Sequence, residues 1–168
     1  AGVKNLFFLG SSCIYPKKCK QPMKEEYLLS GPLEQTNEAY CIAKISGVKM
    51  CEYYSDVKKI NYKSFMPPNL YGPNDNYNLK SSHFYPALLR KIYTCKKKRV
   101  KKLKIWGTGK AKRETMFVED FANALAYFIN IKIKEPYINI GTGKQYSIDW
   151  YAKFMMRAMN VKLKIIYD

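Results

Sequence analysis

Two side chains in the first third of the chain have the types and spacing for proton transfer. Tyr40 and Lys44 are four residues apart, so on a helix both project from one face, one turn apart. An ammonium close to a phenol favours the phenolate, which suits Tyr40 to exchange a proton with a substrate oxygen. The pattern alone is weak, because an amphipathic helix with an exposed lysine also produces it. Ser11 strengthens it, because a hydroxyl at the end of the preceding strand could bind the same oxygen.

A thiol and an imidazole form a second candidate pair. Cys13 lies two residues after Ser11, and His83 is the only histidine of the chain. Histidine is the side chain that ordinarily exchanges protons near neutral pH. Taken alone, Cys13 could equally be a small buried residue, and His83 a loop histidine satisfied by its neighbours.

The number and spacing of the cysteines indicate the redox environment of the protein. Five cysteines without a C-x-x-C pair, together with one histidine, indicate neither a disulfide framework nor a metal site. We therefore expect no metal and a reducing, cytoplasmic environment.

The residues around these groups predict alternating strands and helices. A short apolar run at 3–9 ends at Gly10-Ser11-Ser12, which is typical of a buried parallel strand, and ligands bind at the carboxyl ends of such strands. A helix follows from about Glu38 to Val57, which Thr36 or Asn37 could cap. Further strands are predicted at 61–66, 103–106 and 137–140, further helices at 84–93, at 118–129 and after Ser147, and a loop at 67–73. This order predicts an α/β fold with a mainly parallel sheet.

Composition limits the class of protein. With 168 residues, 47% of them hydrophobic, the chain can bury a core, and no apolar run reaches the roughly 20 residues of a membrane-spanning helix. We expect a soluble protein that is not secreted. The 30 Lys and Arg against 13 Asp and Glu give a net charge of +17, but only four of the 30 are arginine. Nucleic-acid readers rely on arginine, so we expect no nucleic-acid partner and predict that the dense stretch Lys96 to Lys104 is a tolerated surface loop.

Three motifs make the chain resemble the extended short-chain dehydrogenase/reductases. They are GSSCIYP from Gly10, NEAYCIAK from Asn37 and PNLYGPNDNY from Pro68. The similarity continues through Ser82-His83, Pro86 to Arg90 and Trp106 to Gly109 as far as Glu114, so it covers nearly the whole chain. It implies a Rossmann-like sheet with a smaller α/β substrate-binding part. It also implies an NADPH-dependent enzyme that epimerises C3 and C5 of GDP-4-keto-6-deoxy-D-mannose and reduces C4, giving GDP-L-fucose.

The resemblance also implies a role for each candidate residue. Ser11 and Tyr40 would hold and protonate the C4 oxygen, and Lys44 would bind the nicotinamide ribose. Cys13 and His83 would be the acid and base of epimerisation, because inversion beside a carbonyl requires a base on one face and an acid on the other. The residues implied to touch NADPH are Leu9, Gly10, Ser11, Ser12, Tyr40, Lys44, Pro67, Pro68, Asn69, Leu70 and His83. Those implied to bind the GDP-sugar are Lys91, Trp106 and Arg113, of which Arg113 could equally form a surface ion pair with Glu114.

The same resemblance predicts the domain organisation. Residues 1–75 would be the C-terminal half of an NADP-binding Rossmann domain and 76–168 mainly the substrate-binding region, with about 118–145 returning to the Rossmann sheet. The glycine-rich G-x-x-G-x-x-G turn that holds the pyrophosphate in this family has no counterpart here, because the turns at 107–109 and 141–143 lack the third glycine. We therefore expect an incomplete sheet with an exposed apolar edge.

The sequence leaves several hypotheses about function open. Another nucleotide-sugar epimerase or dehydratase of the family would share the fold but would not need Cys13 and His83. A non-catalytic module could bind nucleic acid through Lys96 to Lys104, and an inactive relative could serve association alone. The family implies a homodimer through the helix that bears Tyr40 and Lys44. The small residues Ala39, Ala43 and Gly47 would permit close approach to a partner, although they could equally pack on the sheet.

Overall fold

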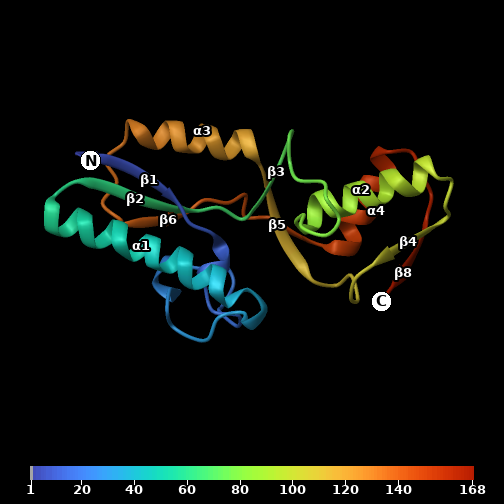
Figure 1. The fold of residues 1–168 in the computed structure, drawn as a ribbon, viewed down its shortest axis with the longest axis horizontal. Coiled ribbons are helices and arrows are strands. Elements are labelled where there is room, and N and C mark those ends of the chain that lie inside the picture. The colour runs from blue at the N-terminus through green and yellow to red at the C-terminus, as the bar shows by residue number, and fades with distance from the viewer. Residues whose placement is uncertain (1) are drawn as a thin grey trace. The chain divides into compact units, whose positions relative to one another are not determined.

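The structure is a computed structural model that describes residues 2–168. The chain forms two compact units (Figure 1). Unit 1 consists of Ala1–Leu70 and Val118–Gly143, and unit 2 of Tyr71–Phe117 and Lys144–Asp168. Among the described residues, no helix combines the length and the apolar character needed to cross a membrane.

Unit 1 is built on a three-stranded parallel sheet with the order β1-β2-β6. Its strands are β1 (Asn5–Leu9), β2 (Asn61–Met66) and β6 (Tyr137–Asn139). The helices α1 (Glu38–Lys58) and α3 (Val118–Ile129) lie on opposite sides of this sheet (Figure 1). The central strand is buried from Ser64 to Met66 because both of its faces are covered. The carboxyl ends of the three strands therefore meet at one edge, as the sequence predicts for a ligand site.

The predicted helix at 38–57 is confirmed, and so is Asn37 at its N-cap position, but without the side-chain hydrogen bond of a cap. A 3-10 helix η3 (Gln35–Asn37) precedes α1 directly and continues into it, and the Asn37 N–H donates to the Glu34 carbonyl at 2.9 Å. The entry of α1 is thus held by backbone bonds and needs no side-chain cap.

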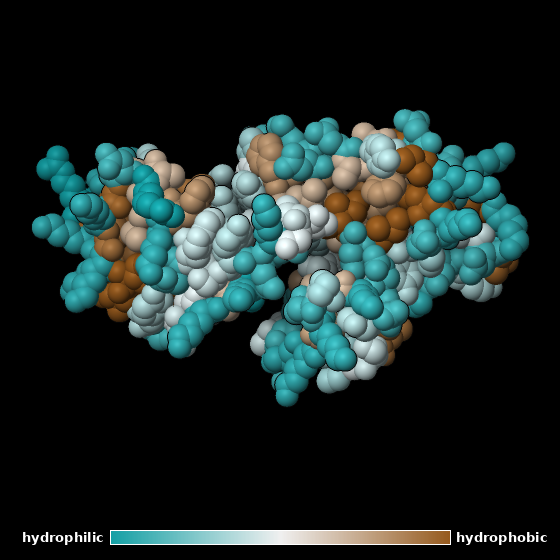
Figure 2. All heavy atoms as spheres, turned by 180° about the vertical axis from the view of Figure 1, so that it is seen from behind, coloured by the Kyte–Doolittle hydropathy of each residue, from teal (hydrophilic) through white to brown (hydrophobic). Residues whose placement is uncertain are grey.

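β1 is parallel, as predicted, but it is not buried. It is an edge strand of its sheet, and Leu6 and Leu9 are 40% and 42% exposed. The same unit exposes other hydrophobic side chains: Figure 2 shows them gathered on its surface along α3, and Val118 and Ile129 are exposed hydrophobic residues of that helix. An apolar run predicts burial only when something covers the strand, and within the described residues one side of β1 has no neighbour.

Unit 2 joins two helices to two short sheets. Its helices are α2 (Phe84–Lys97) and α4 (Ile148–Ala158). Its strands are β4 (Lys102–Ile105), β5 (Lys112–Phe117), β7 (Gln145–Ser147) and β8 (Lys164–Tyr167). A further strand, β3 (Asn69–Tyr71), ends at Tyr71, which is the first residue of unit 2. β4 pairs with β8 in parallel, and β5 pairs with β7 antiparallel. The core between helices and strands contains Leu88, Ile92, Leu103, Tyr151 and Met155.

In unit 2 the predicted helices are found, but several strands were missed. Ser147 caps α4 as predicted, accepting a hydrogen bond from the Trp150 N–H at 3.1 Å. The segment 67–73, predicted as a loop, contains the strand β3, and β5, β7 and β8 were not predicted. The lysine-rich stretch is not one loop either, since it begins in α2 and ends in β4. The three- and four-residue strands β3, β7 and β8 carry too little alternation to be recognised without their partners, and β5, although six residues long, begins with three charged residues that hide its strand pattern.

Candidate active site

The turn that follows β1 lies directly beside the end of β2. The Gly10 N–H donates to the Phe65 carbonyl at 2.8 Å, and the Ser12 N–H donates to the Pro67 carbonyl at 3.0 Å. A Cβ atom at Gly10 would lie 2.8 Å from the Met66 sulfur, so any larger residue would require the Met66 side chain to move. Residues 9–12 and 67–70, both predicted to touch the cofactor, are therefore neighbours at the carboxyl edge of the sheet.

Ser11 and Cys13 are carried by a short 3-10 helix, η1 (Ser12–Ile14). Ser11 is its N-cap, and its hydroxyl oxygen accepts a hydrogen bond from the Cys13 N–H at 3.2 Å. Ile14 is fully buried and anchors the turn in the core, while Cys13 is exposed. The turn thus presents a hydroxyl and a thiol at the sheet edge.

The helix α1 brings Tyr40 and Lys44 to this turn. The Lys44 ammonium donates to the Leu9 carbonyl at 2.8 Å and lies 5.8 Å from the centroid of the Tyr40 ring. Gly47 allows α1 to lie this close, because a Cβ atom there would be 2.2 Å from the Phe8 ring. The structure therefore brings the predicted residues Ser11, Tyr40 and Lys44 to one place in unit 1.

A second contact joins α1 to the turn. Cys41, the residue after Tyr40, is fully buried and donates its thiol hydrogen to the Cys13 carbonyl at 3.0 Å. Burial raises the pKa of the Cys41 thiol. Nothing in the sequence distinguished Cys41 from its neighbours, because its partner is 28 residues away.

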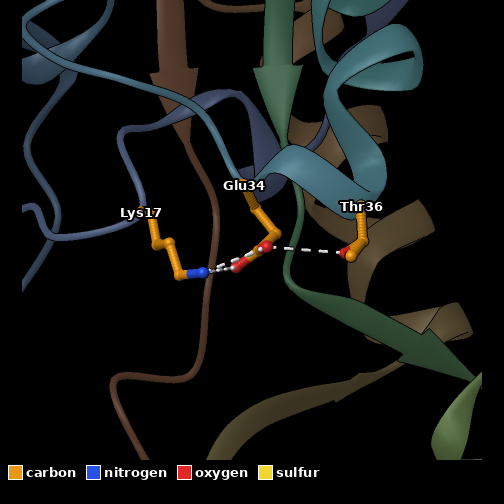
Figure 3. Close-up of polar contacts among 3 residues, drawn as sticks. All are labelled: Lys17, Glu34 and Thr36. Atoms are coloured by element: carbon orange, nitrogen blue, oxygen red, sulfur yellow. Dashed lines mark hydrogen bonds and ion pairs between the residues drawn. The ribbon is translucent and has the colours of Figure 1, made fainter.

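An ion pair holds the segment between η1 and α1. The Lys17 ammonium lies 2.9 Å from one Glu34 carboxylate oxygen, and the Thr36 hydroxyl lies 3.5 Å from the other (Figure 3). The hydrogen bond from Lys17 lowers the pKa of Glu34. The pair ties the chain that leaves the Ser11 turn to the chain that enters α1.

A partly buried hydrogen-bond network supports the same turn from the side of β6. The Tyr15 hydroxyl donates to the Asn139 side-chain oxygen at 2.6 Å. The Asn139 N–H donates to the Glu25 carboxylate at 2.7 Å, and its side-chain amide donates to the Met23 carbonyl at 3.1 Å. Burial raises the pKa of Tyr15 well above its usual range. This network was also missed, since Tyr15 and Asn139 are 124 residues apart and neither the motif around Tyr15 nor the predicted strand around Asn139 indicates that they pair.

The other predicted site residues belong to unit 2. His83 is the N-cap of α2, is exposed and makes no side-chain capping bond. Lys91 is half-buried on α2, Trp106 is 87% exposed directly after β4, and Arg113 is exposed on β5. One Arg113 guanidinium N–H donates to the Lys112 carbonyl at 2.8 Å. Cys13 and His83 lie in different units, so their pairing stays a prediction.

The fold and the unit 1 site define a class of protein. A parallel α/β sheet, with a serine turn at its carboxyl edge and a Tyr-x-x-x-Lys helix against that turn, is the arrangement of a Rossmann-type short-chain dehydrogenase/reductase. The chain belongs to the NAD dependent epimerase/dehydratase family, whose family model matches residues 1–141.

The names of individual relatives are more specific than the name of the family. The chain is 46% identical to the GDP-L-fucose synthase of Sinorhizobium fredii, over 100% of this chain and 54% of the relative. It is 40% identical to the GDP-L-colitose synthase of Yersinia pseudotuberculosis, over 99% of this chain and 54% of the relative. The solved structure of a GDP-L-fucose synthetase from Naegleria fowleri bound to NADP matches with a TM-score of 0.90 and 28% identity, over 99% of this chain and 54% of that one. The chain spans about half the length of the curated relatives it matches.

Proposed function

We propose that the chain supplies catalytic residues of a GDP-L-fucose synthase. The reaction is the NADPH-dependent epimerisation at C3 and C5 of GDP-4-keto-6-deoxy-D-mannose and its reduction at C4. The observation that carries the proposal is the Lys44 contact with the Leu9 carbonyl at 2.8 Å, which sets the Tyr40 helix against the Ser11 turn. The 46% identity to a GDP-L-fucose synthase favours this substrate over others of the family.

Ser11 and Tyr40 serve the C4 oxygen. Both hydroxyls can donate a hydrogen bond to a carbonyl oxygen, and negative charge develops on that oxygen during reduction. Tyr40 is 45% exposed, so a substrate can reach its hydroxyl. Tyr40 protonates the oxygen, while Ser11 orients it.

The residues of unit 1 fit the nicotinamide end of NADPH. Lys44 uses one of its three N–H donors on the Leu9 carbonyl, which leaves two for ribose hydroxyls and for Tyr40. Residues 9–12 and 67–70 line the sheet edge where open α/β sheets bind ligands. When bound, NADPH would supply the hydride for C4.

Cys13 and His83 serve epimerisation. Protons must leave and return on opposite faces at C3 and C5, which requires two groups that exchange protons. Both side chains are exposed in their own units and can meet a ligand. Cys13→Ser should therefore lower solvent deuterium exchange at C3 and C5 by about 100-fold, and unchanged exchange would remove Cys13 from this role.

Lys91, Trp106 and Arg113 are proposed to bind the GDP-sugar. An ammonium and a guanidinium suit the diphosphate, and the exposed Trp106 ring suits stacking contact. Lys91 offers a point charge and not a bidentate fork, so its phosphate contact is less directional than an arginine contact.

The proposal includes a homodimer formed through α1. Ile42, Met50, Tyr53 and Val57 are each more than half exposed and recur on one side of the helix. Ala39 and Ala43 are also exposed, whereas Gly47 is covered by Phe8. A helix that is apolar on two faces needs a second packing partner, and a second copy supplies the same face by symmetry.

We also propose a cytoplasmic location. All five cysteines are free thiols. Cysteines persist as thiols in a reducing compartment, which is where nucleotide-sugar reduction by NADPH would proceed.

The test is turnover after the part of the relatives that this chain does not span is supplied. This chain, mixed with the N-terminal half of the Sinorhizobium fredii relative, should oxidise NADPH with GDP-4-keto-6-deoxy-D-mannose and form GDP-L-fucose, detected by chromatography. Tyr40→Phe should lower the rate by about 100-fold or more, because it removes the proton donor. Tyr54→Phe, on the same helix, is the matched control and should leave the rate unchanged. Turnover insensitive to Tyr40→Phe would contradict the proposal.

A second substrate is favoured by one comparison. The 40% identity to a GDP-L-colitose synthase indicates that another GDP-linked keto sugar could occupy the same site. Competition between GDP-4-keto-6-deoxy-D-mannose and this second keto sugar in the same assay, measured as the ratio of their kcat/KM values, shows which substrate the site prefers.

A further inference from the structure

The turn that presents Ser11 and Cys13 has little internal structure to hold it. η1 comprises only three residues, and its internal bonds are the Cys13 N–H to the Ser11 hydroxyl and the Ile14 N–H to the Ser11 carbonyl, at 3.2 Å each. So short a 3-10 helix does not define its own orientation. Its position depends on contacts from neighbouring elements.

Two of those contacts come from α1. Lys44 holds the Leu9 carbonyl before the turn, and Cys41 holds the Cys13 carbonyl within it. Cys41 and Lys44 are three residues apart, so they share one side of the helix. Ser11 lies between the two tethered carbonyls, and Tyr40 precedes Cys41 directly. The same helix that carries the proton donor therefore fixes the segment that carries its partners.

We propose that Cys41 is a positioning residue that holds Cys13 and Ser11 in place against Tyr40. The proposal rests on the function proposed above. Cys41 is fully buried, and its thiol finds a carbonyl acceptor at 3.0 Å, so it does more than fill space. Because burial raises its pKa, the thiol keeps its hydrogen at neutral pH and remains a donor.

The first test needs no substrate. Deuterium exchange of the Cys13 and Ile14 backbone N–H groups, which are hydrogen-bonded within the turn, is followed by mass spectrometry, with the N–H groups of α4 in unit 2 as an internal reference. Cys41→Ala removes the donor, so the turn should open more often and the Cys13 exchange rate should rise about threefold or more. Cys41→Ser keeps a donor and should restore a rate within about twofold of the original.

A matched variant separates positioning from packing. Cys51 is a second buried cysteine on α1, ten residues further along the helix than Cys41. Cys51→Ala should lower the unfolding midpoint without changing the Cys13 exchange rate. Equal rates in Cys41→Ala and the unaltered chain, or equal effects of Cys41→Ala and Cys51→Ala, would overturn the proposal.

The second test uses the assembled enzyme. Cys41→Ala should lower deuterium exchange at C3 and C5 and the C4 reduction rate through kcat, while Cys41→Ser restores both. A loss in Cys41→Ala that appears only in KM would overturn the positioning role. If the assembled enzyme turns over no substrate at all, the proposed function fails, while the amide-exchange result still decides what Cys41 does.

Discussion

At the residue scale, Gly47 shows how a residue without a side chain lets α1 approach the sheet and so determines where the site residues lie. Alanine is a better helix former than glycine by about 1 kcal/mol, so Gly47→Ala would stabilise α1 if the position were open. A Cβ atom at Gly47 would instead lie 2.2 Å from the Phe8 ring. We expect Gly47→Ala to destabilise the chain by about 1–3 kcal/mol, because α1 must move off the sheet. Urea unfolding measures this loss, and adding Phe8→Leu should recover part of it. A stabilised Gly47→Ala variant would show that α1 does not pack on β1 as described.

A carboxylate in unit 2 gives a prediction for pH. Asp149 pairs with Lys153 at 2.6 Å and accepts a hydrogen bond from the Tyr167 hydroxyl, and the Lys153 hydrogen bond is the main reason that its pKa is lowered. A lowered folded-state pKa contributes stability that is present above the unfolded value of about 3.9 and lost as the pH falls through the folded value. Asp149→Asn should therefore unfold more easily than the unaltered chain at pH 7 but nearly equally at pH 2.

The check is the free energy of unfolding measured at steps between pH 7 and pH 2. Asp56→Asn is the control, because Asp56 is exposed and makes no ion pair among the described residues. The free energies of unfolding of Asp149→Asn and Asp56→Asn should differ at pH 7 and become nearly equal at pH 2. A constant difference between Asp149→Asn and the unaltered chain at every pH would exclude this linkage.

At the scale of elements, α1 serves two surfaces. Its buried side contains Cys41, Ile45, Val48 and Cys51, and its other side leaves Ile42 and Met50 exposed. We expect the double variant Ile42→Glu with Met50→Glu to sediment as a monomer at concentrations where the unaltered chain is a dimer, because charge opposes burial of that face. Tyr127→Glu with Ile129→Glu on α3, both also more than half exposed, is the control. Identical sedimentation of all three proteins would rule out a dimer through α1.

At the scale of the whole molecule, the positive charge is unevenly divided. Unit 2 holds 18 Lys and Arg against 4 Asp and Glu, a net charge of +14, while unit 1 holds 12 against 9, a net charge of +3. Such an excess attracts polyanions without sequence preference. We expect a single-stranded RNA probe to bind with a Kd of about 10⁻⁴ to 10⁻⁶ M at physiological salt.

The same experiment tests the alternative of a nucleic-acid-binding module. Glutamine at Lys97, Lys98, Lys101 and Lys102 should weaken RNA binding and lower the slope of log K against log salt by about 0.7 for each phosphate that is no longer neutralised. The same change at Lys18, Lys20, Lys58 and Lys132 of unit 1 should have a smaller effect. Sequence-specific binding far tighter than about 10⁻⁶ M, removed by the unit 2 substitutions, would favour a binding module over incidental charge.

The sequence by itself determined the elements that local patterns encode. The range of α1 follows from helical periodicity, and the cap of α4 follows from Ser147, because both involve residues within a few positions of each other. The motifs around Ser11 and Tyr40 also indicated the family, which the match to residues 1–141 confirms. Sequence did not determine whether Gly47 faces the sheet or a partner.

Only the tertiary structure decided the contacts between distant segments. The Lys44 contact with Leu9, the Cys41 contact with Cys13 and the Tyr15 contact with Asn139 join residues 35, 28 and 124 positions apart. The strands β3, β7 and β8, of three or four residues, are likewise too short to be recognised before their pairing is known. Local sequence determines which conformations a segment favours, whereas the position of a side chain at the sheet edge depends on how helices and strands pack together.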